Sequence, residues 1–111
     1  MIRPVAVACA LAGCVDDKGP RLDTVMPMAA GHGAMVTLAG RRLCGETGNC
    51  ETAGGEVTLG LDLPTVKANV VEYTDTRAVI VVPDVAPVGA TQVVITVNER
   101  ASNAIDFEVL P

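Results

Sequence analysis

Residues 76–83 read TRAVIVVP, residues 91–97 read TQVVITV and residues 104–110 read AIDFEVL. The first two segments consist largely of β-branched residues, and a proline ends the first, which is typical of buried strands. The third alternates apolar with acidic residues and therefore predicts a strand with one buried and one solvated face. The alternation assigns the following side chains to the core: Ala78, Ile80, Val82, Val93, Ile95, Val97, Ile105, Phe107 and Val109.

Further strands are expected toward the N-terminus. They cover residues 21–26, 34–43, 56–60 and 66–73, with a small-residue loop at 28–33. Val36 and Leu38 share one face of the second of these strands, and Val57 and Leu59 share one face of the third. No window sustains a helical period, because glycine or proline interrupts every candidate. About seven short strands separated by frequent turn signals predict an all-β antiparallel sandwich.

Length and composition narrow the class of protein. The chain has 111 residues, enough for one small domain, and 50% of them are hydrophobic, which excludes disorder. Tyr73 and Phe107 are the only aromatic residues, so an aromatic-lined sugar or base platform is not expected. The formal net charge is −5 and no basic run is longer than Arg41-Arg42. A nucleic-acid binder needs a clustered positive face, and this sequence does not provide one.

The first residues predict an export signal. Arg3 supplies one positive charge and an uncharged run follows, about half as long as a membrane-spanning helix requires. The ending Leu11-Ala12-Gly13-Cys14 resembles the bacterial lipobox. This resemblance implies a lipoprotein signal peptide at 1–13, a lipidated Cys14 and a short tether at 14–19. It also implies a membrane-anchored protein of the bacterial cell envelope, in either the inner or the outer membrane. The alternatives are a free Cys14 thiol after an ordinary signal sequence, or a frayed apolar terminus.

Two cysteines remain for the exported domain. Cys44 and Cys50 enclose Gly-Glu-Thr-Gly-Asn, which can turn back tightly, and export favours oxidation. We therefore expect a disulfide. A zinc site is the alternative interpretation. The cysteine ligands of zinc sites are usually two to four residues apart, however, and a structural zinc ion needs four ligands. The acidic residues show no alternating calcium-loop pattern, so we expect no metal.

The order of motifs resembles a known family. PRLDTVMP at 20–27 looks like the opening Pro-x-Ile-x-x-Ile-x-Pro strand of IPT/TIG domains, and GAMVTLAG at 33–40 is similar to their Gly-x-x-Val-Thr-Ile-x-Gly. Further matches are VTLG at 57–60, the strands at 76–83 and 93–97, Ser102-Asn103 and Phe107. The resemblance implies an immunoglobulin-like sandwich over residues 20–111 and a frequent role in contacts between proteins or beside a catalytic domain in glycan-handling enzymes. It implies no catalytic residue, and Leu43 stands where the family usually has an aromatic.

Catalytic machinery is not apparent. His32 lies between two glycines and is expected to be a solvated loop residue, and Ser102 more plausibly caps a turn than attacks a substrate. The context needed by a serine nucleophile and the lysine of a P-loop are both missing. We expect no enzyme activity and no cofactor.

The sequence therefore predicts a non-enzymatic interaction module that binds an unidentified envelope or extracellular protein through loops or an edge strand. The expected contact loop contains Arg41, Arg42, Glu46 and Asn49, although the two arginines could serve solubility alone. One alternative is a glycan-binding or enzyme-accessory module, for which Tyr73 is the candidate aromatic. Another is a purely structural surface coat.

Overall fold

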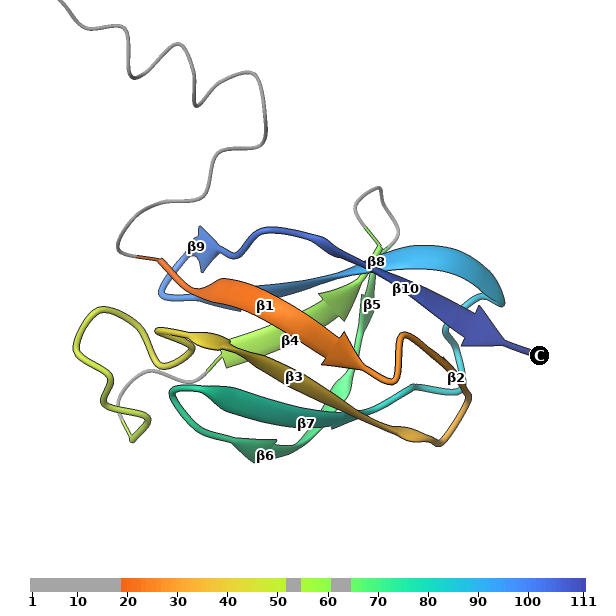
Figure 1. The fold of residues 1–111 in the computed structure, drawn as a ribbon, viewed down its shortest axis with the longest axis horizontal. Helices are drawn as coiled ribbons and strands as arrows, with labels where there is room; N and C mark the ends of the chain where they lie inside the picture. Colours follow the sequence, from red (N-terminus) through yellow and green to blue (C-terminus); the bar gives the residue numbers. More distant parts are fainter. Residues whose placement is uncertain (1–18, 52–54, 61–64) are drawn as a thin grey trace, which may run out of the picture.

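The computed structural model describes residues 19–51, 55–60 and 65–111, and the predicted signal peptide and Cys14 lie outside them. Within these residues ten strands form two packed sheets and no helix occurs (Figure 1). The strands are β1 (Arg21–Met26), β2 (Ala29–Gly31), β3 (Met35–Arg41), β4 (Gly55–Leu59), β5 (Val66–Lys67), β6 (Asn69–Tyr73), β7 (Arg77–Val81), β8 (Gly89–Val97), β9 (Arg100–Ala101) and β10 (Ile105–Leu110). The predicted all-β sandwich is confirmed.

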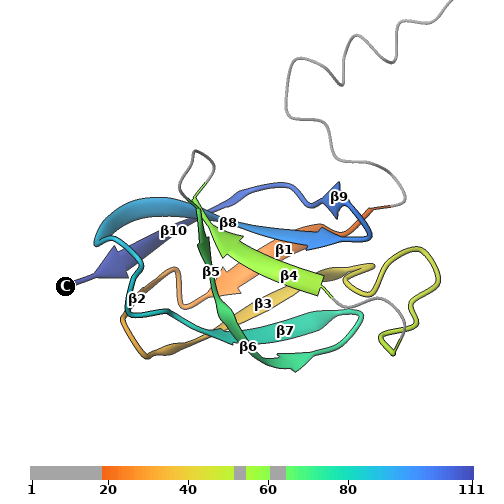
Figure 2. The same ribbon diagram turned by 180° about the vertical axis from the view of Figure 1, so that it is seen from behind.

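The first sheet has the order β1-β3-β7-β6 and the second has the order β2-β10-β8-β4-β5, with β9 paired to β8 (Figure 2). The core lies between the sheets. The six predicted inward side chains of β7, β8 and the residue after β7 are at most 1% exposed: Ala78, Ile80, Val82, Val93, Ile95 and Val97. Phe107 and Val109 are also buried, whereas Ile105 packs against the core and is only partly buried. The alternating pattern thus predicted the core faces correctly.

Two segments differ from the sequence prediction because the chain changes sheets inside them. The segment 28–33 was expected to be a loop, but it contains β2, which pairs with β10 in parallel. The step from β1 to β2 occurs at the cis peptide bond between Met26 and Pro27. β2 consists of two alanines and a glycine, which carry little intrinsic preference for a strand. Its pairing therefore depends on the neighbouring strand rather than on local sequence.

The segment 66–73 was expected to be one strand, but it divides at Ala68 into β5 of the second sheet and β6 of the first. Ala68 is 3% exposed, and its N–H donates to the Val57 carbonyl over 2.9 Å. A crossing strand presents different faces to the core before and after the crossing. This explains why the segment shows no consistent alternation. β9 is a further two-residue strand that the sequence did not predict.

Ser102 and Asn103 tie the two sheets together. The Ile95 N–H donates to Ser102 Oγ over 2.9 Å, and that hydroxyl donates to the Asn103 carbonyl over 2.8 Å. The Asn103 side chain bonds both backbone groups of Leu22 in β1, each over 2.8 Å. Ser102 is therefore a structural residue, and Asn103 occupies the outer edge of β1.

Candidate functional site

The disulfide loop, residues 43–51, lies at the end of the sandwich where β3 ends and β7 begins, which we call the loop end (Figure 1). Cys44 and Cys50 form the predicted disulfide, with their Cα atoms 4.8 Å apart. Cys44 is fully buried, whereas Cys50 is exposed. The bridge thus joins the tip of the loop to the core.

Three hydrogen bonds hold the base of the loop. The Tyr73 hydroxyl donates to the Leu43 carbonyl, and the Leu43 N–H donates to the Asp75 carbonyl over 2.9 Å. The Cys44 N–H donates to Asp75 Oδ1 over 3.1 Å. Burial raises the pKa of Tyr73 above its ordinary value, and the charge of Asp75 raises it further. The phenol therefore stays neutral and keeps its proton for the Leu43 carbonyl.

The tip of the loop is polar and exposed from Glu46 to Glu51. The Gly48 N–H donates to the Gly45 carbonyl over 3.2 Å, and the Glu51 N–H donates to Asn49 Oδ1 over 3.0 Å. Glu46 lies 3.5 Å from Arg100 of β9. The tip consequently presents polar groups on a backbone that is fixed from below and braced internally.

The four predicted contact residues have different partners in the structure. Glu46 and Asn49 lie on the loop tip. Arg41 ends β3 and pairs with Asp23 of β1 over 3.6 Å. Arg42 is half-buried, and its Nε donates to the Gly19 carbonyl over 2.9 Å. The neighbouring arginines therefore have different partners, which their adjacency in the sequence does not reveal. Whether these four residues bind a partner protein stays a prediction.

Tyr73 is not an exposed aromatic face. Its side chain is half-buried and packs against the core, and a Cβ at Gly55 would collide with its ring. The hydroxyl supports the base of the disulfide loop, and sugar binding by Tyr73 stays an untested prediction. His32 is exposed as predicted, and its Nε2 lies 2.7 Å from the Ala86 carbonyl, to which it donates.

The opposite end of the sandwich, where β1 and β7 end and β3 and β8 begin, carries exposed apolar side chains that the sequence analysis missed. We call it the apolar end. Its large apolar side chains are 38–76% exposed: Met26, Met28, Met35, Val85, Val88 and Leu110. Exposed apolar side chains that gather at one end of a fold can mark a contact site. Strand alternation could not locate it, because these residues come from strand ends and turns.

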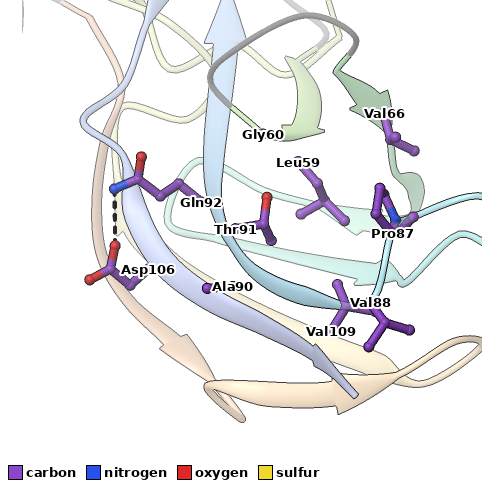
Figure 3. Close-up of a pocket in the computed structure, with 11 residues that line it drawn as sticks. Leu59, Gly60, Val66, Pro87, Val88, Ala90, Thr91, Gln92, Asp106 and Val109 are labelled. Carbon is purple, nitrogen blue, oxygen red and sulfur yellow. Dashed lines mark hydrogen bonds between the residues drawn. The ribbon is translucent and has the colours of Figure 1, made fainter. Parts of the chain in front are cut away.

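An open cavity of about 520 Å³ lies at the apolar end (Figure 3). Leu59, Val88 and Val109 contribute apolar side chains to its lining. Gln92 and Asp106 contribute polar groups, joined by a hydrogen bond of 2.9 Å from Gln92 Nε2 to Asp106 Oδ1. No group of three metal-binding side chains and no helix able to cross a membrane occur among the described residues.

Comparison with known proteins identifies the fold but not the family. No family model matches the chain, and no curated protein matches its sequence. The gamma-CGTase of alkalophilic Bacillus clarkii is 24% identical with a TM-score of 0.67, over 84% of this chain and 12% of that chain. A Bacteroides thetaiotaomicron protein of unknown function is 13% identical with a TM-score of 0.67, over 86% of this chain and 23% of that chain. An auxiliary nutrient binding protein of Bacteroides ovatus is 15% identical with a TM-score of 0.52, over 84% of this chain and 21% of that chain. The chain spans less than a quarter of each.

Proposed function

We propose that this chain is a non-enzymatic, lipid-anchored protein of the bacterial cell envelope. Its IPT/TIG-like domain binds another envelope or extracellular protein through the disulfide loop. The observation that supports this proposal is the bracing of that loop by the Cys44–Cys50 bridge and by Tyr73 and Asp75. A loop fixed before binding loses little conformational entropy on binding, so its exposed polar tip makes a specific contact surface.

The position of the first described residues predicts how the disulfide loop is oriented relative to the membrane. Gly19 and Pro20 border the same small hollow as Gly45 and Glu46, so the described chain begins at the loop end. If Cys14 carries lipid, the five residues from it to Gly19 span at most about 18 Å. The disulfide loop would then lie close to the bilayer surface and the apolar end would point away from it. A partner that meets the loop is accordingly expected to be another membrane-proximal protein.

Mass spectrometry of the protein from a membrane fraction tests the anchor. We expect a first residue of Cys14, an added acyl mass and an intact bridge between Cys44 and Cys50. A chain that begins at Met1 with unmodified thiols would overturn the lipid-anchored assignment.

Site-specific photo-cross-linking tests the contact. A photoreactive side chain at Asn49, on the loop tip, is expected to capture one defined protein, whereas the same group at the exposed Asn69 of β6 is expected to capture none. Replacing Cys44 and Cys50 by serine should abolish the cross-link while the domain stays folded. Equal capture from both positions, or an unchanged cross-link without the bridge, would exclude the loop as the contact surface.

A second candidate is an accessory module beside a catalytic domain. It is favoured by the similarity to 12% of a gamma-CGTase chain. This candidate predicts binding to glycans on an array, with no dependence on the disulfide loop. A Tyr73→Ala variant does not test it cleanly, because Tyr73 also supports the loop.

A further inference from the structure

The two ends of the sandwich differ in charge. Every described arginine lies at the loop end, at strand termini or in the loops between them: Arg21, Arg41, Arg42, Arg77 and Arg100. Lys67, the remaining described base, pairs with Glu56 over 3.1 Å. Lys67 follows Val66 of the cavity lining, and Glu56 balances its charge. The other charged residues that the structure describes next to the apolar end are acidic. Asp84 precedes Val85 in the turn after β7, Glu108 precedes Val109 in β10, and Asp106 borders the cavity. The apolar end is therefore an apolar surface with an acidic rim.

The backbone of the apolar end is fixed by hydrogen bonds between its turns. The Gly33 N–H donates to the Val82 carbonyl over 2.9 Å, and His32 Nε2 donates to the Ala86 carbonyl over 2.7 Å. The Glu108 N–H donates to the Met28 carbonyl over 3.0 Å, which joins β10 to the turn before β2. The exposed side chains thus project from a rigid frame. Three of them are methionines, whose flexible thioether chains adapt to varied apolar partners.

We infer that the apolar end is a second docking site, separate from the disulfide loop, for a protein segment that presents a bulky apolar side chain flanked by lysine or arginine. The apolar side chain enters the cavity among Leu59, Val88 and Val109 (Figure 3). A volume of about 520 Å³ falls in the range of about 300–1,000 Å³ that binding pockets occupy, so one large side chain fits with room for its neighbours. The lysine or arginine residues on either side of it contact the carboxylates of the acidic rim.

Charge complementarity favours a basic protein segment over a second copy of this chain and over an anionic membrane surface. A second copy would bring the same acidic rim against itself, and like charges across an interface oppose association. An anionic membrane surface would be repelled by the same carboxylates. Binding of this segment does not involve the disulfide loop. The docking site can therefore be tested independently of the function proposed above.

Nuclear magnetic resonance titration of the full chain tests the inference with synthetic peptides. The probe is acetyl-Lys-Lys-Leu-Phe-Lys-Lys-amide, compared with the same peptide carrying glutamate in place of lysine and with one carrying serine in place of Leu-Phe. We expect the lysine peptide with Leu-Phe to shift the amide signals of Val88, Ala90 and Val109, and both comparison peptides to bind at least about fivefold more weakly. The chain with Cys44 and Cys50 replaced by serine should bind the lysine peptide as wild type does.

Val88→Ser and Val71→Ser form a matched pair, because the two side chains are 55% and 56% exposed and lie on different parts of the fold. Val88→Ser should weaken the lysine peptide at least about fivefold, whereas Val71→Ser should leave its affinity unchanged. Equal effects of the two substitutions, equal binding of the glutamate peptide, or shifts confined to the loop end would overturn the inference. So would self-association of the full chain, or its binding to phosphatidylcholine vesicles, if Val88→Ser abolished either.

Discussion

Replacing Asn103 by alanine should destabilise the domain strongly. The substitution removes two hydrogen bonds of 2.8 Å, one that Oδ1 accepts from the Leu22 N–H and one that Nδ2 donates to the Leu22 carbonyl. Leu22 is 2% exposed, so water does not readily replace the lost partners. An unsatisfied buried polar group costs about 1–3 kcal/mol. Two such groups should lower the free energy of unfolding by about 2–6 kcal/mol.

Denaturant and thermal unfolding measure this loss. For a domain of this size, about 2 kcal/mol corresponds to a fall in Tm of about 8 °C or more. Asn69→Ala is the control, because Asn69 is exposed on β6 and its truncation should change stability by less than about 0.5 kcal/mol. If Asn103→Ala matched Asn69→Ala, the account of Asn103 as the tie between β1 and the second sheet would be refuted.

Three further predictions concern the disulfide loop and the first sheet. Tyr73 is the single tyrosine, and its pKa is raised above the ordinary value of 10.0. The folded chain thus keeps the phenol protonated where the unfolded chain ionises it, so Tyr73 contributes stability below about pH 10 that is lost as the pH rises further. Ultraviolet titration should show tyrosinate forming at higher pH in the folded chain than in denaturant, and coincident curves would contradict this. Replacing both Cys44 and Cys50 by serine should lower the free energy of unfolding by about 2 kcal/mol in the chain-entropy model. Denaturant unfolding measures this loss against the oxidised wild type. No loss would mean that the bridge does not constrain the unfolded chain. Gly40→Ala should lower the free energy of unfolding by about 3 kcal/mol or prevent folding, because the new Cβ would collide with the Arg21 carbonyl across the β1–β3 pair. A thermal unfolding curve from circular dichroism that is unchanged from wild type would disprove that contact.

The sequence predicted strands best where one face of the strand meets one core throughout its length. β7 and β8 satisfy this condition, and every inward position of the segments at 76–82 and 93–97 is buried as the alternation indicated. The prediction weakened at 66–73, because Ala68 marks a crossing between sheets and the buried face changes there. It missed β2, because two alanines and a glycine pair with β10 only through tertiary contact.

The candidate sites were predictable to different degrees. The bridge between Cys44 and Cys50 followed from their spacing and from the export that the first residues predict, and the bridge is confirmed. The role of Tyr73 did not follow, because the Leu43 carbonyl that accepts its hydroxyl lies 30 residues away in the sequence. The apolar end could not be found either, because a methionine at a strand end has the same local pattern whether it faces the core or the solvent.

The sequence by itself determined that this chain forms an all-β sandwich with a bridged loop, because strand periodicity and cysteine spacing are local properties of a few neighbouring residues. Only the tertiary structure decided which strands share a sheet, that Tyr73 supports the disulfide loop, and that the exposed methionines and the described arginines lie at opposite ends. Those features depend on contacts between residues far apart in the chain, and each arises only when both sheets are in place.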